Sequence, residues 1–178
     1  GAVAKGYATE IVAKEIMKDG LVSGIINAGG NIRVIGKPLD NVREKWSVGV
    51  QNPDESVISD DDNILEVVFI NDHSVVSSGD YQRYYIVDDK RIHHIIDPET
   101  LMPGDHFRAI TVITKDSGVA DFLSTAVFLM PYEEGVQFVN SFEGVETIWV
   151  MPDGTVKATD GAKRIMKSQG ATGSGQNK

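Results

Sequence analysis

The chain has 178 residues, no cysteine, and a formal net charge of −9 from 26 acidic and 17 basic side chains. The absence of cysteine excludes disulfides, thiolate metal sites and cysteine nucleophiles, and an acidic chain without a basic cluster argues against a nucleic acid partner. No apolar run reaches the roughly 18 residues of a membrane-spanning helix, and a hydrophobic content of 41% fits one globular domain.

The elements predicted from apolar periodicity and turn residues follow one another closely. The first is an amphipathic helix over residues 3–19, which Gly20 ends. One apolar face of this helix holds Val3, Tyr7, Ala8, Ile11, Val12 and Ile16. Strands are predicted over 21–28, 31–36, 45–53, 64–72, 73–79 and 108–114, hairpins over 84–97 and 145–160, and helices over 117–130 and 131–142.

Strands outnumber helices in this pattern, and most of them are joined by hairpins. We therefore expect an α+β fold with helices packed on a mostly antiparallel sheet. No linker divides the chain into two domains. The polar, Gly-rich end predicts a flexible tail over residues 162–178.

The predicted helix over 117–130 carries polar residues inside an apolar sequence. Asp121 and Thr125 lie one helical turn apart, with Ser124 beside them. A buried carboxylate must be paired or bound to a cation, and carboxylate and hydroxyl oxygens suit Mg²⁺ or Ca²⁺ and not zinc. Spacing alone favours a polar face with satisfied hydrogen bonds over a metal site, and it leaves both interpretations open.

Other motifs allow a site but do not require one. “RIHHIIDPET” at 91–100 places His93 and His94 on opposite faces of a strand. Such a histidine is either an ordinary half-buried side chain or a group that moves protons or binds phosphate. The glycines of “INAGGNI” at 26–32 and “SSGDYQRYY” at 77–85 allow either close approach of a ligand or a tight turn.

Taken in order, seven motifs resemble the ApbE family, whose members are FAD:protein FMN transferases, formerly described as thiamine biosynthesis lipoproteins. The motifs are “GAVAKGYA” at 1–8, “INAGGNI” at 26–32, “SSGDYQRYY” at 77–85, “RIHHIIDPETLMP” at 91–103, “TVIT” at 111–114, “ADFLSTAVF” at 120–128 and “ETIWVMPDGTV” at 146–156. The resemblance implies that residues 1–161 are the C-terminal portion of an ApbE-like domain with a T-fold-like α+β structure.

The resemblance also implies an activity. Members of the family use Mg²⁺ to transfer FMN from FAD to a Thr or Ser hydroxyl of a target flavoprotein, and AMP leaves. Some relatives also hydrolyse FAD to FMN and AMP. FAD and an acceptor flavoprotein are therefore the expected partners, and the bacterial cell envelope, outside the cytoplasm, is the expected location.

Site residues follow from the same resemblance, motif by motif. The implied metal ligands are Asp121, Thr125 and a backbone carbonyl taken to be that of Ala2. His94 and Asp121 are the implied catalytic residues, and which of them accepts the hydroxyl proton stays open. The implied FAD contacts are Lys5 near the phosphates, Gly29 and Gly30 at a close-approach turn, Gly79, Asp80 and Tyr81 on the flavin side, and His94.

The sequence departs from the family in three places. Leu101 follows Thr100 where the family has glycine, and Asn31 follows the Gly-Gly pair where the family often has Asp. Relatives also carry a segment before “GAVAKG” that helps to build the nucleotide pocket. We therefore expect a fragment or a mature chain without its leader. Two alternatives to a transferase follow: a non-catalytic FAD-binding module that needs this segment, and a structural partner that assembles with it.

The end of the chain holds one more match. Residues 168–173 read “SQGATG”, which resembles the S/T-G-A-T/S pattern of acceptor sites in this system. In a Gly-rich tail such a match arises easily by chance, and this is our interpretation of Thr172.

Overall fold

The computed structural model describes residues 3–53 and 63–174. Its elements in chain order are α1 (Ala4–Lys18), β1 (Gly24–Ala28), β2 (Asn31–Ile35), β3 (Trp46–Gln51), β4 (Ile64–Ile70), β5 (Ser74–Gly79), β6 (Tyr84–Val87), β7 (Lys90–His93), β8 (Ala109–Thr114), α2 (Ser117–Phe128), α3 (Tyr132–Asn140), β9 (Glu146–Val150), β10 (Val156–Ala158), α4 (Asp160–Lys163) and a 3₁₀ turn, η1 (Lys167–Gln169). Within these residues, no helix is both long and apolar enough to cross a membrane.

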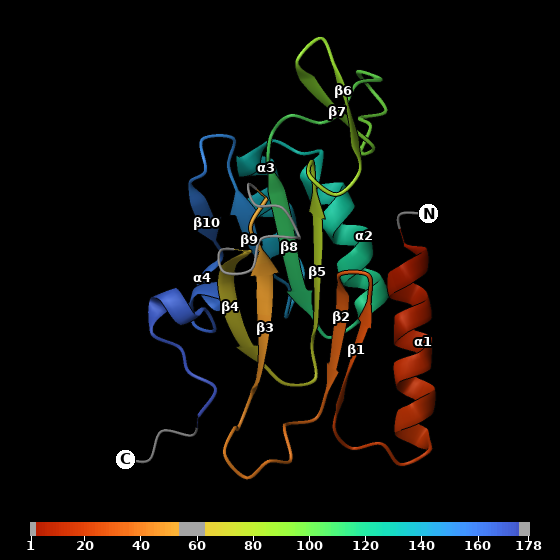
Figure 1. Ribbon diagram of the computed structural model, residues 1–178, viewed down its shortest axis with the longest axis vertical. Helices are drawn as coiled ribbons and strands as arrows, with labels where there is room; N and C mark the ends of the chain where they lie inside the picture. Colours follow the sequence, from red (N-terminus) through yellow and green to blue (C-terminus); the bar gives the residue numbers. More distant parts are fainter. Residues whose placement is uncertain (1–2, 54–62, 175–178) are drawn as a thin grey trace.

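The centre of the molecule is an antiparallel sheet of six strands in the order β1-β2-β5-β8-β9-β10 (Figure 1). This confirms the predicted α+β class and the antiparallel sheet. Among the described strands, β3 and β4 form a separate two-stranded sheet, and β6 and β7 form another. β4 and β5 are thus neighbours in sequence but not in a sheet, because the chain crosses between two layers at Asn71-Asp72.

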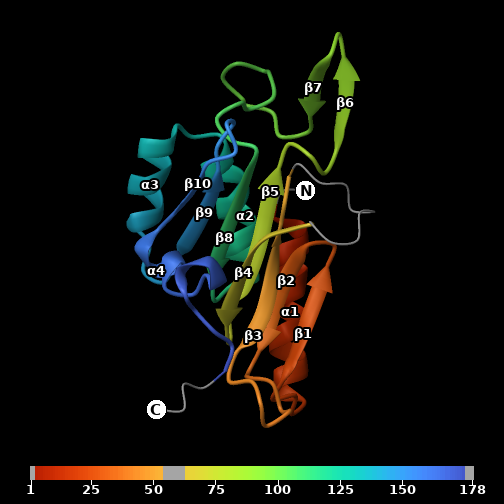
Figure 2. The same cartoon turned by 60° about the vertical axis from the view of Figure 1, so that its left-hand side comes forward.

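Strand alternation divides the core into two clusters, one on each face of the sheet. Val76 and Trp149 belong to the cluster that packs against α2 and α3. Their neighbours in sequence, Val75 and Ile148, belong to the cluster that packs against β3 and β4. The six-stranded sheet is therefore the middle of three layers, with α1, α2 and α3 on one side and the β3–β4 pair and α4 on the other (Figures 1 and 2).

The β6–β7 hairpin stands apart from these layers. It projects beyond one end of the sheet, above α2 (Figures 1 and 2). Val87 pairs with Lys90, and the two turn residues Asp88 and Asp89 have φ angles of 47° and 60°. Positive φ at both positions is typical of a type I′ hairpin turn, so the hairpin predicted around Asp88 is confirmed.

Helix α1 buries a different face from the one that its apolar pattern predicted. Tyr7 and Val12 are 64% and 49% exposed, whereas the buried positions are Gly6, Thr9, Glu10 and Ala13. The reason is the tight contact with α2, which admits only small side chains and a paired carboxylate. The helix was therefore predicted correctly, but the face that it buries was predicted wrongly.

The flexible tail predicted over 162–178 is not what the structure has up to residue 174. The side chain of Met166 is 4% exposed and lies in the core cluster under β3 and β4. The Phe69 N–H donates to Ile165 O at 2.9 Å, and the Glu44 N–H donates to Gly173 O at 2.8 Å. Apolar residues inside the 162–166 segment account for this docking. Residues 175–178 lie outside the described part.

Candidate functional site

One cleft of about 870 Å³ collects most of the predicted site residues. It lies where the N-terminal end of α1, the β1–β2 turn, the end of β5, the base of the β6–β7 hairpin and one face of α2 meet. Predicted residues that line it are Lys5, Gly29, Gly30, Tyr81, His94, Asp121 and Thr125. Its volume lies in the range of roughly 300–1,000 Å³ that is typical of small-molecule sites.

Asp121 is held by the backbone of α1. The Gly6 N–H donates to Asp121 Oδ2 at 2.7 Å, and the carboxylate residue is only 7% exposed. Thr125, which also lines the cleft, donates its hydroxyl to Asp121 O at 3.4 Å. Ser124 is fully buried, where its hydroxyl contacts Ser78 Oγ at 2.8 Å and Asp121 O at 3.0 Å. Ser124 thus joins α2 to β5, a role that spacing alone did not assign.

A close helix crossing makes this bond to Asp121 feasible. A Cβ atom at Gly6 would lie 2.2 Å from Ser117 O and 2.5 Å from the Cβ of Asp121. No other residue fits there without moving the helices apart. The glycine of “GAVAKG” is therefore explained by contact between the backbones of α1 and α2.

The Gly-Gly turn faces open space. Gly29 and Gly30 have φ angles of 60° and 89°, and a Cβ at either would meet nothing within 4 Å. Lys5 Nζ donates to Gly29 O at 3.3 Å, so the ammonium group stands at the edge of the cleft. Positive φ explains the glycines, and the open space leaves room for a ligand beside a cation.

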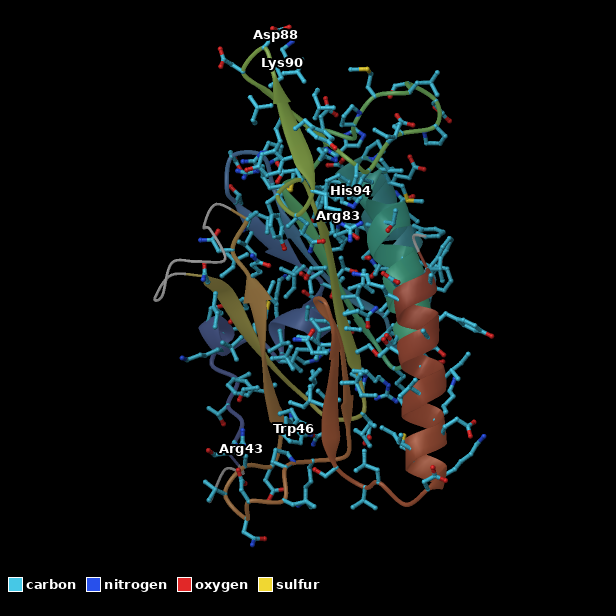
Figure 3. The ribbon with its side chains drawn as sticks, turned by 45° about the vertical axis from the view of Figure 1, so that its right-hand side comes forward. Arg43, Trp46, Arg83, Asp88, Lys90 and His94 are labelled. Atoms are coloured by element: carbon cyan, nitrogen blue, oxygen red, sulfur yellow. The ribbon has the colours of Figure 1, made fainter. Side chains whose placement is uncertain are left out.

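The two adjacent histidines have opposite surroundings, as strand alternation predicted. His93 is 5% exposed, its Nε2 lies 2.8 Å from Gly104 O, and its ring packs edge-on against Phe128. His94 is exposed and lines the cleft, with Nδ1 3.2 Å from Arg83 O (Figure 3). A carbonyl only accepts, so Nδ1 carries the proton in the neutral ring and Nε2 is left as the basic nitrogen.

Of the predicted flavin-side loop, only Tyr81 lines the cleft. Asp80 lies beside it, and its carboxylate pairs with Arg91 Nη1 at 3.0 Å and Arg108 Nε at 2.8 Å. Because Arg91 is on β7, these bonds fix the hairpin to the sheet. A Cβ on Gly79 would lie 2.3 Å from the Tyr81 ring, so this glycine makes room for that ring. Burial raises the pKa of the Tyr81 phenol.

Several residues that line the cleft were not predicted as site residues. They are Gln51, Ser77, Ser78, Gln82, Arg83, Ile95, Ile96 and Leu129. Ser77, Ser78, Gln82 and Arg83 belong to the “SSGDYQRYY” motif, where their position beside the glycine was the available signal. Leu129, at the end of α2, follows Thr125 by one helical turn, and this spacing was the available signal, whereas Gln51, at the end of β3, gave no local signal.

The donor set near Asp121 fits Mg²⁺. In the described part of the chain, no three His, Cys, Asp or Glu side chains converge on a common point, so a multi-carboxylate cage is absent there. Mg²⁺ commonly takes one or two carboxylates and completes its octahedral shell with phosphate and water. Asp121 supplies a carboxylate and Thr125 a hydroxyl oxygen within one cleft. Ala2, the third predicted ligand, lies outside the described residues and stays a prediction.

The altered “DPETLMP” turn carries backbone strain at Leu101. Leu101 has a φ of 59°, which a non-glycine residue adopts at a cost of about 1 kcal/mol. Asp97 holds the turn: its side chain accepts from the Glu99 N–H at 2.9 Å and the Thr100 hydroxyl at 3.0 Å. These bonds lower the pKa of Asp97, the backbone N–H of Glu99 having the largest effect.

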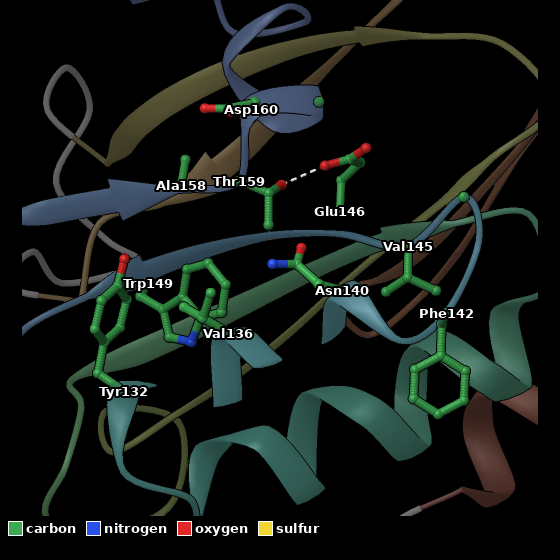
Figure 4. A pocket seen from close by; sticks show the side chains of 12 residues that line it. Tyr132, Val136, Asn140, Phe142, Val145, Glu146, Trp149, Ala158, Thr159 and Asp160 are labelled. Atoms are coloured by element: carbon green, nitrogen blue, oxygen red, sulfur yellow. Dashed lines mark hydrogen bonds between the residues drawn. The ribbon is translucent and has the colours of Figure 1, made fainter. Parts of the chain in front are cut away.

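A second cavity, of about 330 Å³, lies between α3, β9, β10 and α4. Thr159 and Glu146 are hydrogen-bonded to each other in its wall, and Tyr132 and Trp149 pack edge-on nearby (Figure 4). None of the predicted site residues lines this cavity. Thr172 lines neither cavity, and its hydroxyl donates to Ser174 O at 3.2 Å.

Comparison with known proteins gives a consistent result. A sequence model of the ApbE family matches residues 1–149. An FAD:protein FMN transferase of Treponema pallidum (strain Nichols) is 33% identical over 168 residues, which are 90% of this chain and 45% of that protein. One from Klebsiella pneumoniae (strain 342) is 33% identical over 84% of this chain and 44% of its own length.

Solved structures agree with the sequence comparison. The crystal structure of the ApbE protein from Thermotoga maritima matches with a TM-score of 0.80 and 30% identity, over 92% of this chain and 52% of that one. The apo form of the Pseudomonas stutzeri flavinyl transferase ApbE matches with a TM-score of 0.73 and 26% identity, over 92% and 50% of the two chains. The chain thus spans about half the length of the relatives it matches.

Proposed function

This chain belongs to the ApbE family, and on that premise we propose that it carries the metal-binding and catalytic side of an FMN transferase. The observation that carries the proposal is the single cleft that joins Asp121, Thr125, Lys5 and His94. A carboxylate and a hydroxyl for a hard cation, an ammonium group and an imidazole are groups that can position and stabilise a phosphoryl group during transfer. FAD is the proposed substrate, as the names of the curated relatives suggest.

The proposed reaction is a displacement at phosphorus. The hydroxyl oxygen of an acceptor Thr or Ser attacks the FMN phosphorus of FAD, and the bond from that phosphorus to the bridging oxygen breaks. AMP leaves with the electron pair, and a phosphoester joins FMN to the acceptor protein. With water in place of the hydroxyl, the same displacement yields free FMN and AMP.

His94 is the better placed of the two candidate bases. Its Nε2 is the unprotonated nitrogen when Nδ1–H donates to Arg83 O, and its ring lies on the wall of the cleft. Asp121 already accepts a hydrogen bond at Oδ2 and is buried. We therefore assign removal of the hydroxyl proton to His94 and metal binding to Asp121.

Mg²⁺, bound by Asp121 and Thr125, would supply positive charge that stabilises the phosphates in the transition state. Lys5, on the same wall of the cleft, adds a second positive charge, and its ammonium group would bind a phosphate oxygen. Gly29 and Gly30 leave space for that phosphate, because nothing lies where their side chains would be. Tyr81, half-buried at the same wall, offers a ring face to the flavin.

The test uses the chain, FAD, Mg²⁺ and an acceptor protein with an S/T-G-A-T/S segment. Covalent FMN on the acceptor, measured by mass spectrometry, is the expected result. Asp121→Asn should lower the rate by roughly two to three orders of magnitude, whereas Asp153→Asn at the exposed β9–β10 turn should not change it. If neither this chain nor one extended to the relatives' full length transfers FMN, the proposal is wrong.

A second candidate is a flavin-nucleotide binding module without catalysis. The strained Leu101 turn and the match to only half of each relative favour it. FAD binding that is insensitive to EDTA, without release of AMP, would support this candidate over transfer.

We propose two further properties on the strength of the family. A polypeptide segment equivalent to the unmatched half of the relatives would cover the exposed apolar side chains of α1, such as Tyr7. Co-elution of the chain with that segment in size-exclusion chromatography tests this. The proposed location is the bacterial cell envelope outside the cytoplasm, which fractionation of cells that express the natural gene would test.

A further inference from the structure

A buried ion pair lies between α1 and the sheet, away from the cleft. Glu10 on α1 and Arg33 on β2 have side chains that are 7% and 8% exposed, with Oε2 3.1 Å from Nε. The same Oε2 accepts the N–H of Ser117, the first residue of α2, at 3.0 Å. One carboxylate oxygen therefore joins a helix, a strand and the start of a second helix.

The hydrogen bonds that begin at Glu10 extend through Ser117 to the Gly-Gly turn. The Ser117 hydroxyl donates to Asn31 Oδ1 at 2.6 Å, and both residues are fully buried. Asn31 follows Gly30 directly and begins β2. The three segments joined by Glu10, Ser117 and Asn31 are thus the segments that bring Lys5, the Gly-Gly turn and Asp121 to the cleft.

Glu10 also lies one helical turn after Gly6, on the same buried face of α1. The Gly6 N–H donates to Asp121 Oδ2 at 2.7 Å. Anything that rotates or slides α1 moves this donor relative to the carboxylate. The position of Glu10 against Ser117 therefore sets the position of Gly6 against Asp121.

Stability alone is a poor explanation for the pair. Removing two charges from water costs free energy that their attraction often does not repay, and apolar residues of the same volume often pack as stably. Separating the two partners is costly, however, because it leaves a buried charge unpaired, so the pair restricts how α1 and β2 can be arranged.

From these contacts we propose that Glu10 is a positioning residue, which orients the Asp121 carboxylate for Mg²⁺ by fixing α1 against α2. The inference rests on the proposed function for the identity of the metal. Groups that hold the ligands of a metal typically change its affinity by about 10- to 100-fold when they are lost.

The test compares three variants. Glu10→Gln keeps an oxygen for the Ser117 N–H but loses the charge opposite Arg33. Glu10→Leu combined with Arg33→Met keeps the packed volume and loses the bond to Ser117. Glu15→Gln, on the same helix, removes an exposed carboxylate that pairs with the exposed Lys18 at 2.7 Å and serves as the control.

Two readouts separate positioning from folding. The first is the Mg²⁺ affinity of the chain with FAD present, measured by calorimetry, which should fall roughly 10- to 100-fold in the Leu/Met variant and less in Glu10→Gln. The second is hydrogen exchange at the Gly6 amide, which should speed up by a similar factor. Both readouts and the unfolding midpoint should be unchanged in Glu15→Gln. Glu10→Gln leaves Arg33 buried without a paired charge and should lower the unfolding midpoint, so both readouts are taken at a temperature at which each variant is folded.

The two measurements test the positioning role of Glu10 separately from the proposed function. A Leu/Met variant that keeps wild-type Mg²⁺ affinity and Gly6 exchange overturns the positioning role. If the wild-type chain binds no Mg²⁺ with FAD, the proposed function fails instead, and Gly6 exchange alone then tests Glu10. Should the Leu/Met variant not fold, Glu10→Gln, which removes only a charge, decides by the same two measurements.

Discussion

The two walls of the cleft are built in different ways. One wall consists of α1, the Gly-Gly turn and α2, and buried polar contacts join Glu10, Ser117 and Asp121 there. The other wall is the base of the β6–β7 hairpin, where all four residues of β6 are exposed. A two-stranded hairpin is only marginally stable by itself in water. The wall proposed to bind metal is therefore rigid, and the wall that carries His94 depends on a few anchors.

Among variants of the hairpin wall, the largest expected effect comes from the two histidines. His94→Ala should lower kcat for FMN transfer roughly 100-fold without changing the unfolding midpoint, because its ring is exposed and lines the cleft. His93→Ala should do the reverse: it loses the contacts to Phe128 and Gly104 and about 2–3 kcal/mol of unfolding free energy. Steady-state kinetics and thermal unfolding measure both. Loss of turnover in His93→Ala alone, at a temperature where it is folded, would reverse this assignment.

The next largest effect is expected at Asp80, which attaches the β6–β7 hairpin to the sheet. Asp80→Asn leaves Arg91 and Arg108 without their shared carboxylate, which should weaken the attachment of β7 by about 1.5 kcal/mol, or roughly tenfold. Hydrogen exchange of β6 and β7 amides should rise, while exchange in α1 and α2 stays constant.

Asp88→Asn provides the matched control, because it makes the same change at the exposed tip of the same hairpin, where Asn tolerates positive φ. A uniform rise of exchange over the whole chain in Asp80→Asn would mean that the two walls are not independent.

A smaller effect, of opposite sign, is expected at the strained turn. Leu101→Gly should raise the free energy of unfolding by about 0.5–1 kcal/mol, because glycine adopts a φ of 59° without strain. Leu101 is 75% exposed, so little packing is lost. Leu39→Gly, at a 68% exposed position without positive φ, should instead destabilise the chain. Denaturant unfolding compares them, and destabilisation by both would argue against strain at Leu101.

The smallest effect appears only at alkaline pH. Burial raises the pKa of Tyr81 above its ordinary value of 10.0, so the folded protein keeps the phenol protonated where the unfolded chain ionises it. The associated stabilisation is complete below pH 10 and is lost as pH rises through the folded-state pKa. The free energy of unfolding should therefore fall more steeply above pH 10 in the wild type than in Tyr81→Phe. Equal slopes in denaturant titrations at several pH values would contradict this.

Local sequence patterns predicted the elements better than their contacts. Alternation and turn residues located the β6–β7 hairpin and separated His93 from His94, because both properties depend on adjacent residues. The inward face of α1 was predicted wrongly, since its burial depends on a crossing at Gly6 with residues more than 100 positions away. The docked 162–174 segment was missed for the same reason: Met166 bridges to Val68, on a strand remote in sequence.

In the candidate site, too, local patterns predicted the individual residues but not the contacts between distant segments. The spacing of Asp121 and Thr125 suggested a shared face, and ordered motifs identified the family. No local pattern indicated that Asp80 pairs with two arginines, or that Glu10 lies opposite Arg33, because ion pairs between distant segments leave no periodic signal. The side chains that hold other side chains in place could therefore not be predicted from the sequence.

The crossing at Gly6 has a mechanical consequence. Between α1 and the Asp121 carboxylate there is no side chain to change rotamer, only a backbone N–H at 2.7 Å. A shift of the helix axis therefore moves this N–H directly relative to the carboxylate, because no side chain of α1 lies between them to absorb it. A molecule that binds the outward side of α1, at Tyr7 or Val12, would therefore act on the cleft. Only about one helix diameter of closely packed, nearly incompressible protein separates the two.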